Sequence, residues 1–259
     1  MPAVSEPFPS GTPCWAELAS SDPQRAREFY AGLLGWEAAG ADGPSGGYMD
    51  FVHRGGVIAG LVPNISEPAL PDTWSVYLAS GDAAASAGSV AASGGQVLLG
   101  PRPVPPRGTM ARAGDPSGGS IGIWEPQGHP GFSRIDEAGA PVWYELLTSD
   151  YPAAVGFYRE AFGWETEVLS DTGTFRYSTL QSRGRPVAGI MDGVTDLPEG
   201  VPSHWELYFG HTDVDAAADQ AEQLGGSVLT PPEDSPYGRM VQLGDPTGAV
   251  FWLMEAETD

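Results

Sequence analysis

The same pattern of apolar and polar positions occurs twice along this chain. Residues 13–36, PCWAELASSDPQRAREFYAGLLGW, align without gaps with residues 141–164, PVWYELLTSDYPAAVGFYREAFGW, and the two blocks share eleven of 24 positions. Each block starts with alternating bulky side chains, which predict a strand, and continues with apolar residues at helical spacing. Asp22 is the predicted N-cap of the first helix and Gly35 its predicted end. We expect the repeated Phe-Tyr pairs to pack these helices onto a sheet.

The repeat extends beyond these blocks. WSVYLASGD at 74–82 corresponds to WELYFGHTD at 205–213, and GDPSG at 114–118 corresponds to GDPTG at 244–248. An ordered series of matches over about 115 residues indicates an internal duplication. Short apolar runs separated by Gly and Pro follow each helix and predict three further strands. The chain is therefore expected to carry four β-α-β-β-β units and to belong to the α+β class.

The duplication sets the expected domain organisation. We predict a first domain over residues 12–125 and a second over residues 141–257, each with two of the four units. Residues 126–140, PQGHPGFSRIDEAGA, are rich in Gly, Pro and polar side chains. This composition predicts a linker between the two domains.

Composition narrows the classes of function. The 259 residues include 34 acidic and 12 basic side chains, and the resulting formal charge of −22 disfavours nucleic acid and anionic membranes as partners. No apolar run is long enough to span a membrane, and the first residues lack the pattern of a signal peptide. Cys14 is the single cysteine, which excludes an intramolecular disulfide. We therefore expect a cytoplasmic protein.

The motif D-P-x-x-A-x-x-F-Y-x-x-x-x-G-W, followed by Gly-Asp-Pro-Ser/Thr-Gly before a closing strand, resembles the vicinal oxygen chelate superfamily. That superfamily includes glyoxalase I, bleomycin-resistance proteins and extradiol dioxygenases. The tandem arrangement is similar to an actinobacterial group that includes mycobacterial antigens, a Streptomyces kinase-binding regulator and proteins assigned as antibiotic-pathway hydroxylases. The resemblance implies that every two units form one cupped mixed β-sheet flanked by helices, and hence two tandem glyoxalase-like halves.

The resemblance also implies where metal ligands would lie, on the first and last strands of each unit. These positions are Trp15, about Val76, Trp143 and about Leu207 on the first strands, and Ala59, Gly122, roughly Ile190 and Trp252 on the closing strands. None offers the imidazole or carboxylate that divalent ions prefer. Glu125 and Glu255 lie an odd step further on, so strand alternation is expected to turn them away from the cups. We expect no metal and no other cofactor, with a divalent metal as the alternative.

Aromatic residues recur where the resemblance places the cups. The candidate ligand-binding residues are Trp15, Trp74, Tyr77, Trp124, Trp143, Trp205, Phe209 and Trp252. A concave sheet floored by indoles suits a small planar or hydrophobic molecule, whereas the competing interpretation is that these side chains fill the core. Glu17 and Glu145 lie two residues after the first tryptophan of each block, face the same way, and are the candidate acid–base groups. Because Gly122 stands where the second half has Trp252, the first cup is expected to be the roomier one.

Three classes of function remain open at this point. The first is a protein that binds a small planar aromatic or hydrophobic metabolite without a catalytic metal. The second is a metal-dependent lyase, dioxygenase or hydroxylase of secondary metabolism. The third is a regulatory module that binds a protein, as the kinase-binding relative suggests.

Overall fold

The structure is a computed structural model that describes residues 4, 6–40, 47–65, 70–194, 197 and 200–256. The first half forms one eight-stranded mixed sheet in the order β2-β3-β4-β1-β5-β8-β7-β6. Its strands are β1 (Pro13–Ser20), β2 (Glu37–Ala39), β3 (Met49–His53), β4 (Gly56–Pro63), β5 (Thr73–Ala79), β6 (Gln96–Val104), β7 (Gly108–Gly114) and β8 (Ser120–Pro126). β1 pairs parallel to β4 and antiparallel to β5, so the two units join through their first strands.

The second half repeats this topology in the order β10-β11-β12-β9-β13-β16-β15-β14. Its strands are β9 (Pro141–Thr148), β10 (Glu165–Asp171), β11 (Arg176–Ser182), β12 (Arg185–Asp192), β13 (His204–His211), β14 (Ser227–Ser235), β15 (Gly238–Gly244) and β16 (Val250–Glu255). The predicted α+β fold of four β-α-β-β-β units in two tandem halves is confirmed. In the part of the chain that the structure describes, no helix is long and apolar enough to cross a membrane.

The helices begin and end where the sequence predicts. They are α1 (Pro23–Leu34), α2 (Ala83–Ala92), α3 (Tyr151–Phe162) and α4 (Val214–Gln223). The side chain of Asp22 accepts a hydrogen bond from the Arg25 backbone N–H, and Gly35 ends α1 with φ 68°. In α3 the same positions are held by Asp150 and by Gly163 with φ 70°. Gly is favoured at the C-terminal end of each of these two helices, because a Cβ atom is crowded in this left-handed backbone conformation.

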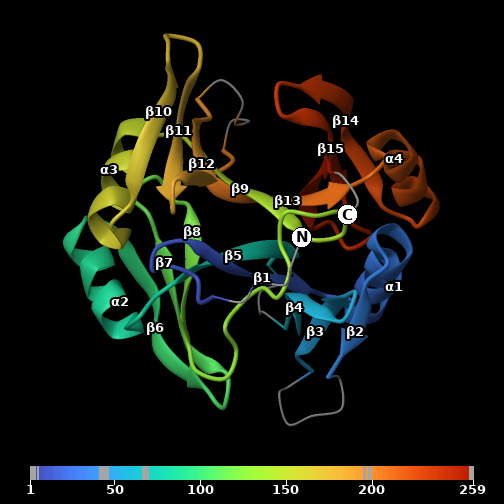
Figure 1. Ribbon diagram of the computed structural model, residues 1–259, viewed down its shortest axis with the longest axis horizontal. Helices are drawn as coiled ribbons and strands as arrows, with labels where there is room; N and C mark the ends of the chain where they lie inside the picture. Colours follow the sequence, from blue (N-terminus) through green and yellow to red (C-terminus); the bar gives the residue numbers. More distant parts are fainter. Residues whose placement is uncertain are drawn as a thin grey trace.

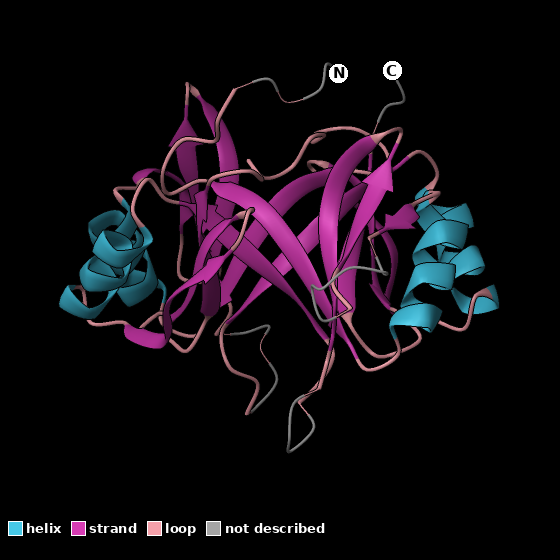
Figure 2. Ribbon diagram, turned by 90° about the horizontal axis from the view of Figure 1, so that it is seen from below, coloured by secondary structure: helices cyan, strands magenta, loops and turns pink. Residues whose placement is uncertain are grey.

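The helices of the two halves pair with each other at the outer ends of the molecule. Figure 1 shows α2 beside α3 on one side and α1 beside α4 on the other, and Figure 2 shows the two sheets between these pairs. The helix-covered faces of the sheets therefore meet in a shared core. Trp36 of the first half packs edge-on against Phe209 of the second at 4.9 Å between ring centroids.

The repeated Tyr and Asp motifs bond the two halves reciprocally. The Tyr30 hydroxyl donates to Asp245 Oδ2 at 3.3 Å, and the Tyr158 hydroxyl donates to Asp115 Oδ2 at 3.2 Å. Each tyrosine comes from a Phe-Tyr pair of one half, and each aspartate from the Gly-Asp-Pro turn of the other. The duplicated motifs thus hold the halves together.

Three aromatic residues expected in the cups lie in this shared core instead. The Trp74 indole donates to the Tyr30 hydroxyl at 2.9 Å, and Trp205 donates to Tyr158 at 3.0 Å. Phe209 is fully buried against Trp74. The reason is strand parity, because side chains alternate between faces and these three fall on the helix-covered face. Their expected place in the cups is therefore wrong.

Candidate functional site

The open face of the second sheet carries a carboxyl held by two phenols. The Tyr177 hydroxyl donates to Glu145 Oε2 at 2.5 Å, and the Tyr208 hydroxyl donates to Glu145 Oε1 at 3.3 Å. The Trp143 indole N–H donates to the Tyr177 hydroxyl at 3.1 Å. These residues come from β9, β11 and β13, whose alternation turns them to one face. Sequence reasoning predicted Glu145 and Trp143 and did not single out Tyr177.

The first sheet repeats the same arrangement. The Tyr77 hydroxyl donates to Glu17 Oε1 at 3.1 Å, and the Trp15 indole donates to the Tyr48 hydroxyl at 3.2 Å. A glycine opposite each carboxylate admits the phenol in both halves. A Cβ at Gly60 would lie 2.0 Å from the Tyr48 hydroxyl, and a Cβ at Gly189 would lie 2.1 Å from that of Tyr177.

The second arrangement borders a cavity. This cavity has a volume of about 360 Å³ and reaches Glu145 at its floor. Its walls include Trp143, Tyr177, Tyr208 and Met240. Volume and lining fit the usual range of small-ligand sites, which are mostly apolar with a few polar groups.

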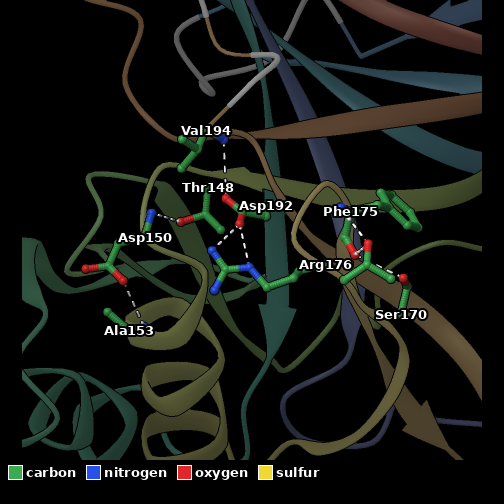
Figure 3. A network of polar contacts seen from close by, with 9 residues as sticks. Thr148, Asp150, Ala153, Ser170, Phe175, Arg176, Asp192 and Val194 are labelled. Atoms are coloured by element: carbon green, nitrogen blue, oxygen red, sulfur yellow. Dashed lines mark hydrogen bonds and ion pairs between the residues drawn. The ribbon is translucent and has the colours of Figure 1, made fainter.

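Two hairpins bring apolar side chains to the mouth of this cavity. Phe175 precedes β11 and is 48% exposed, while Tyr237 lies between β14 and β15 and is 68% exposed. In Figure 1 the β10–β11 hairpin lies at the upper left and the β14–β15 hairpin at the upper right. Figure 3 shows how the first is fixed: the Ser170 hydroxyl donates to the Phe175 carbonyl at 2.9 Å, and Arg176 Nε donates to Asp192 Oδ2 at 2.7 Å.

The segment between the sheets packs against the aromatic residues of the first cup. The His129 ring lies edge-on to Trp15 at 4.3 Å between centroids, and the Trp124 indole donates to the His129 carbonyl at 2.9 Å. The Tyr77 ring takes the space over Gly122, where a Cβ would lie 2.1 Å from the ring. Tyr77 therefore fills the extra space that was expected from Gly122. Trp15, Trp124 and Tyr77 pack within the protein here.

The two carboxyls differ in their electrostatic surroundings. Burial raises the pKa of Glu145 to about 7, the Tyr177 hydrogen bond opposes this rise, and the neighbouring Glu206 carboxylate adds to it. Burial also raises the pKa of Glu17, opposed by the hydroxyl of Tyr77 and the charge of Arg112. A like-charged neighbour thus favours the neutral form of Glu145, whereas a positive charge favours the ionised form of Glu17.

This difference traces to two matched positions. Ser75 pairs with Glu17 across β5, whereas Glu206 pairs with Glu145 across β13. In the first half Arg112 Nη1 donates to the Ser75 hydroxyl at 3.0 Å, and in the second Gln242 Nε2 donates to Glu206 Oε1 at 3.1 Å. The sequence analysis did not single out Glu206. Its two-residue spacing from Tyr208 would have indicated that both side chains lie on the same face of a strand.

Comparison with known proteins shows to which family this chain belongs. The protein named "Putative glyoxylase CFP32" from Mycobacterium tuberculosis is 33% identical over 260 residues, which cover 98% of each chain. The family model of the Glyoxalase/Bleomycin resistance protein/Dioxygenase superfamily matches residues 140–253. The chain belongs to this superfamily. Anthracycline biosynthesis protein DauV from Streptomyces sp. is 34% identical, over 96% of this chain and 94% of its own.

Solved structures of the superfamily share the fold. The Mn(II)-bound glyoxalase from Novosphingobium aromaticivorans matches with a TM-score of 0.66 at 19% identity, covering 96% of this chain and 84% of that chain. The 2,3-dioxygenase LapB from Pseudomonas sp. KL28 matches with a TM-score of 0.64 at 15% identity, covering 95% and 92%. At these identities the likeness concerns the fold alone.

The residues of the second cup do not fit a metal ion. Trp143, Tyr208 and Trp252 lie in one register row across the sheet, and none offers an imidazole or a carboxylate. Both oxygens of Glu145 already accept hydrogen bonds from phenols. Among the residues that the structure describes, no three His, Cys, Asp or Glu side chains are grouped to hold a metal.

The structure also corrects the expected ligand positions. Val76 and Leu207 are buried on the helix-covered face, and the neighbouring Tyr77 and Tyr208 face the cups instead. Ala59 and Ile190 are likewise buried on the helix-covered face. Glu125 turns away from the cup as expected, because its Oε2 accepts from the Ala83 backbone N–H at the start of α2.

Proposed function

We propose that the second cup binds a small planar, largely apolar molecule without a metal, and that Glu145 is its proton-transfer group. The observation that carries this proposal is the cavity of about 360 Å³ with aromatic walls and one buried carboxyl at its floor. Indole and phenol rings offer faces on which a planar ligand stacks, and a carboxylate adds a counter-charge for a cation.

The protonation of Glu145 suits acid–base chemistry. A general acid or base acts best when its pKa lies near the working pH, and that of Glu145 lies at about 7. As a carboxylate it can take a proton from an acidic O–H or C–H group, and Tyr177 and Tyr208 then stabilise the charge by donating to it. The names of two Streptomyces relatives, anthracycline biosynthesis proteins DauV and DnrV, support a substrate from secondary metabolism.

We further propose that the partner is a small molecule and that the protein acts in the cytoplasm. The net charge of −22 disfavours nucleic acid and anionic lipid. The single cysteine, Cys14, is buried on β1, which agrees with a reducing compartment.

Proflavine, a planar cation, is expected to bind the second cup more tightly than anthracene-9-carboxylate, a planar anion. Titration calorimetry should show proflavine affinity rising as pH increases through about 7, because Glu145 then becomes charged. Trp143→Ala should weaken binding by about 1–3 kcal/mol through lost stacking. Glu145→Gln should remove the pH dependence. Glu17→Gln, the matched change in the first cup, should leave affinity unaltered, and equal effects of both glutamine variants would overturn the proposal.

Protein purified without chelator and then dialysed is expected to carry less than about half an equivalent of any transition metal. The reason is the row of indole and phenol side chains where the family places its ligands. Elemental analysis by mass spectrometry measures this directly. A tightly held stoichiometric ion would instead support the alternative of a metal-dependent lyase, dioxygenase or hydroxylase.

A further inference from the structure

A row of polar side chains on β13 leads from the second cup to solvent. His204, Glu206 and Tyr208 alternate along the strand and so share its open face. Glu206 lies directly opposite Glu145 of β9 in the strand register, where the Cβ atoms of paired residues are about 4.5–5.5 Å apart. Glu145 and Glu206 are 7% and 8% exposed, whereas the side chain of His204 is 42% exposed. The row therefore joins a buried carboxyl pair to a solvent-accessible imidazole.

Glu206 is held in place by an amide of fixed orientation. Gln242 Nε2 donates to Glu206 Oε1 at 3.1 Å. Gln242 Oε1 accepts from the Thr230 hydroxyl at 3.4 Å, so the carbonyl side of the amide faces away from the carboxylate. The groups that also face the pair include the hydroxyls of Tyr177 and Tyr208, which donate to Glu145, and the Trp143 indole N–H.

The tautomer of His204 follows from its backbone contact. His204 Nδ1 lies 3.0 Å from the Pro202 carbonyl oxygen, which can only accept, so Nδ1 carries a hydrogen. Nε2 is then the atom that can take up and release a proton, and it lies 3.8 Å from Glu206 Oε1. The Glu206 contact raises the pKa of His204, which favours uptake of a proton at this atom.

We propose that Glu206 and His204 form a proton path between Glu145 and bulk solvent. The proposal rests on the proposed role of Glu145 as the proton-transfer group of the second cup. A proton leaves the Glu145 carboxyl, the Glu206 carboxylate takes it up and passes it to His204 Nε2, and the imidazolium releases it from Nε2 to water or buffer. Each step moves one proton, and the starting tautomer is restored.

The first cup provides an internal comparison. There β1 and β5 place Ser75 opposite Glu17 and Thr73 opposite Ala19, which match the positions of Glu206 and His204. Neither side chain titrates in the physiological range. On the described strand β5, Glu17 therefore faces no titrating row like that of Glu206 and His204 on β13.

A light-triggered pH jump near pH 7 tests the path on the full-length protein without any ligand. Infrared absorption of the protonated carboxyl reports Glu145, and its loss in Glu145→Gln assigns the band. Glu206→Gln and His204→Gln are each expected to slow the relaxation by about tenfold or more, compared at each variant's own midpoint. Added imidazole buffer should restore the rate in His204→Gln and leave Glu206→Gln slow. Ser75→Ala, the matched change in the first cup, should relax as the wild type does.

The outcomes separate this inference from the proposed function. Unchanged relaxation in both Glu206→Gln and His204→Gln overturns the path, whether or not proflavine binds. Slowed relaxation in both supports it, even if proflavine fails to bind and the proposed function falls. His204 is exposed, so its replacement leaves the core intact and keeps the test decisive if Glu206→Gln does not fold.

Discussion

Glu145→Gln is expected to be more stable than the wild type at about pH 8 and to lose this advantage at about pH 4. Burial raises the pKa of Glu145 from 4.5 to about 7. Between these values the folded protein binds more protons than the unfolded chain, so the free energy of unfolding falls as pH rises through this window and is lowest above it. A shift of this size corresponds to about 3 kcal/mol, and a glutamine does not contribute it.

Urea denaturation across that pH range measures the unfolding free energies of Glu145→Gln and of the wild type. In the difference between them, the contributions of the other titrating groups cancel. Glu17→Gln is the matched control. Its effect should be smaller, because the charge of Arg112 opposes the rise in the Glu17 pKa. Parallel stability curves for Glu145→Gln and the wild type would show that Glu145 titrates normally and would remove the basis of its proposed role.

Replacing both Tyr30 and Tyr158 by Phe is expected to cost roughly 2–6 kcal/mol of unfolding free energy, because an unmet buried hydrogen bond costs about 1–3 kcal/mol. Each change leaves a buried indole N–H, of Trp74 or Trp205, without its acceptor. The two sites lie at opposite ends of the shared core, so their effects should add.

Tyr144→Phe serves as the control for these changes. The Tyr144 hydroxyl is buried and has no hydrogen-bond partner among the described residues, so its removal should be neutral or stabilising. Urea denaturation of the four variants compares them directly. Losses for Tyr30→Phe and Tyr158→Phe no larger than that for Tyr144→Phe would mean that the reciprocal contacts do not hold the halves together.

The sequence predicted the fold because its signals are local. The caps at Asp22 and Gly35 depend only on neighbouring residues, and the repeat of the whole pattern fixed the number of units. On β1 the acidic Glu17 among apolar residues marks the open face. On β5 every residue after Thr73 is buried, so the pattern carries no sign of which face Trp74 occupies. Its position depends on the partner half, which no local pattern encodes.

The candidate site was predicted only in part for the same reason. Glu145 stands out as an acid in an apolar strand, but whether its cup is open depends on segments distant in sequence. His129 lies in a stretch with the composition of a linker, and only the fold brings its ring over Trp15. Glu206 lies opposite Glu145 because of the strand register between β13 and β9, which a local sequence pattern does not specify.

The reciprocal contacts of Tyr30 with Asp245 and of Tyr158 with Asp115 have the form of a two-fold interface between copies of one half. Joining the copies in one chain makes their association independent of protein concentration. It also allows the amino-acid sequences of the two copies to differ. In a homodimer every substitution near the carboxyl would act in both cups, whereas here a change in the second cup acts once per molecule while the first remains a packed support.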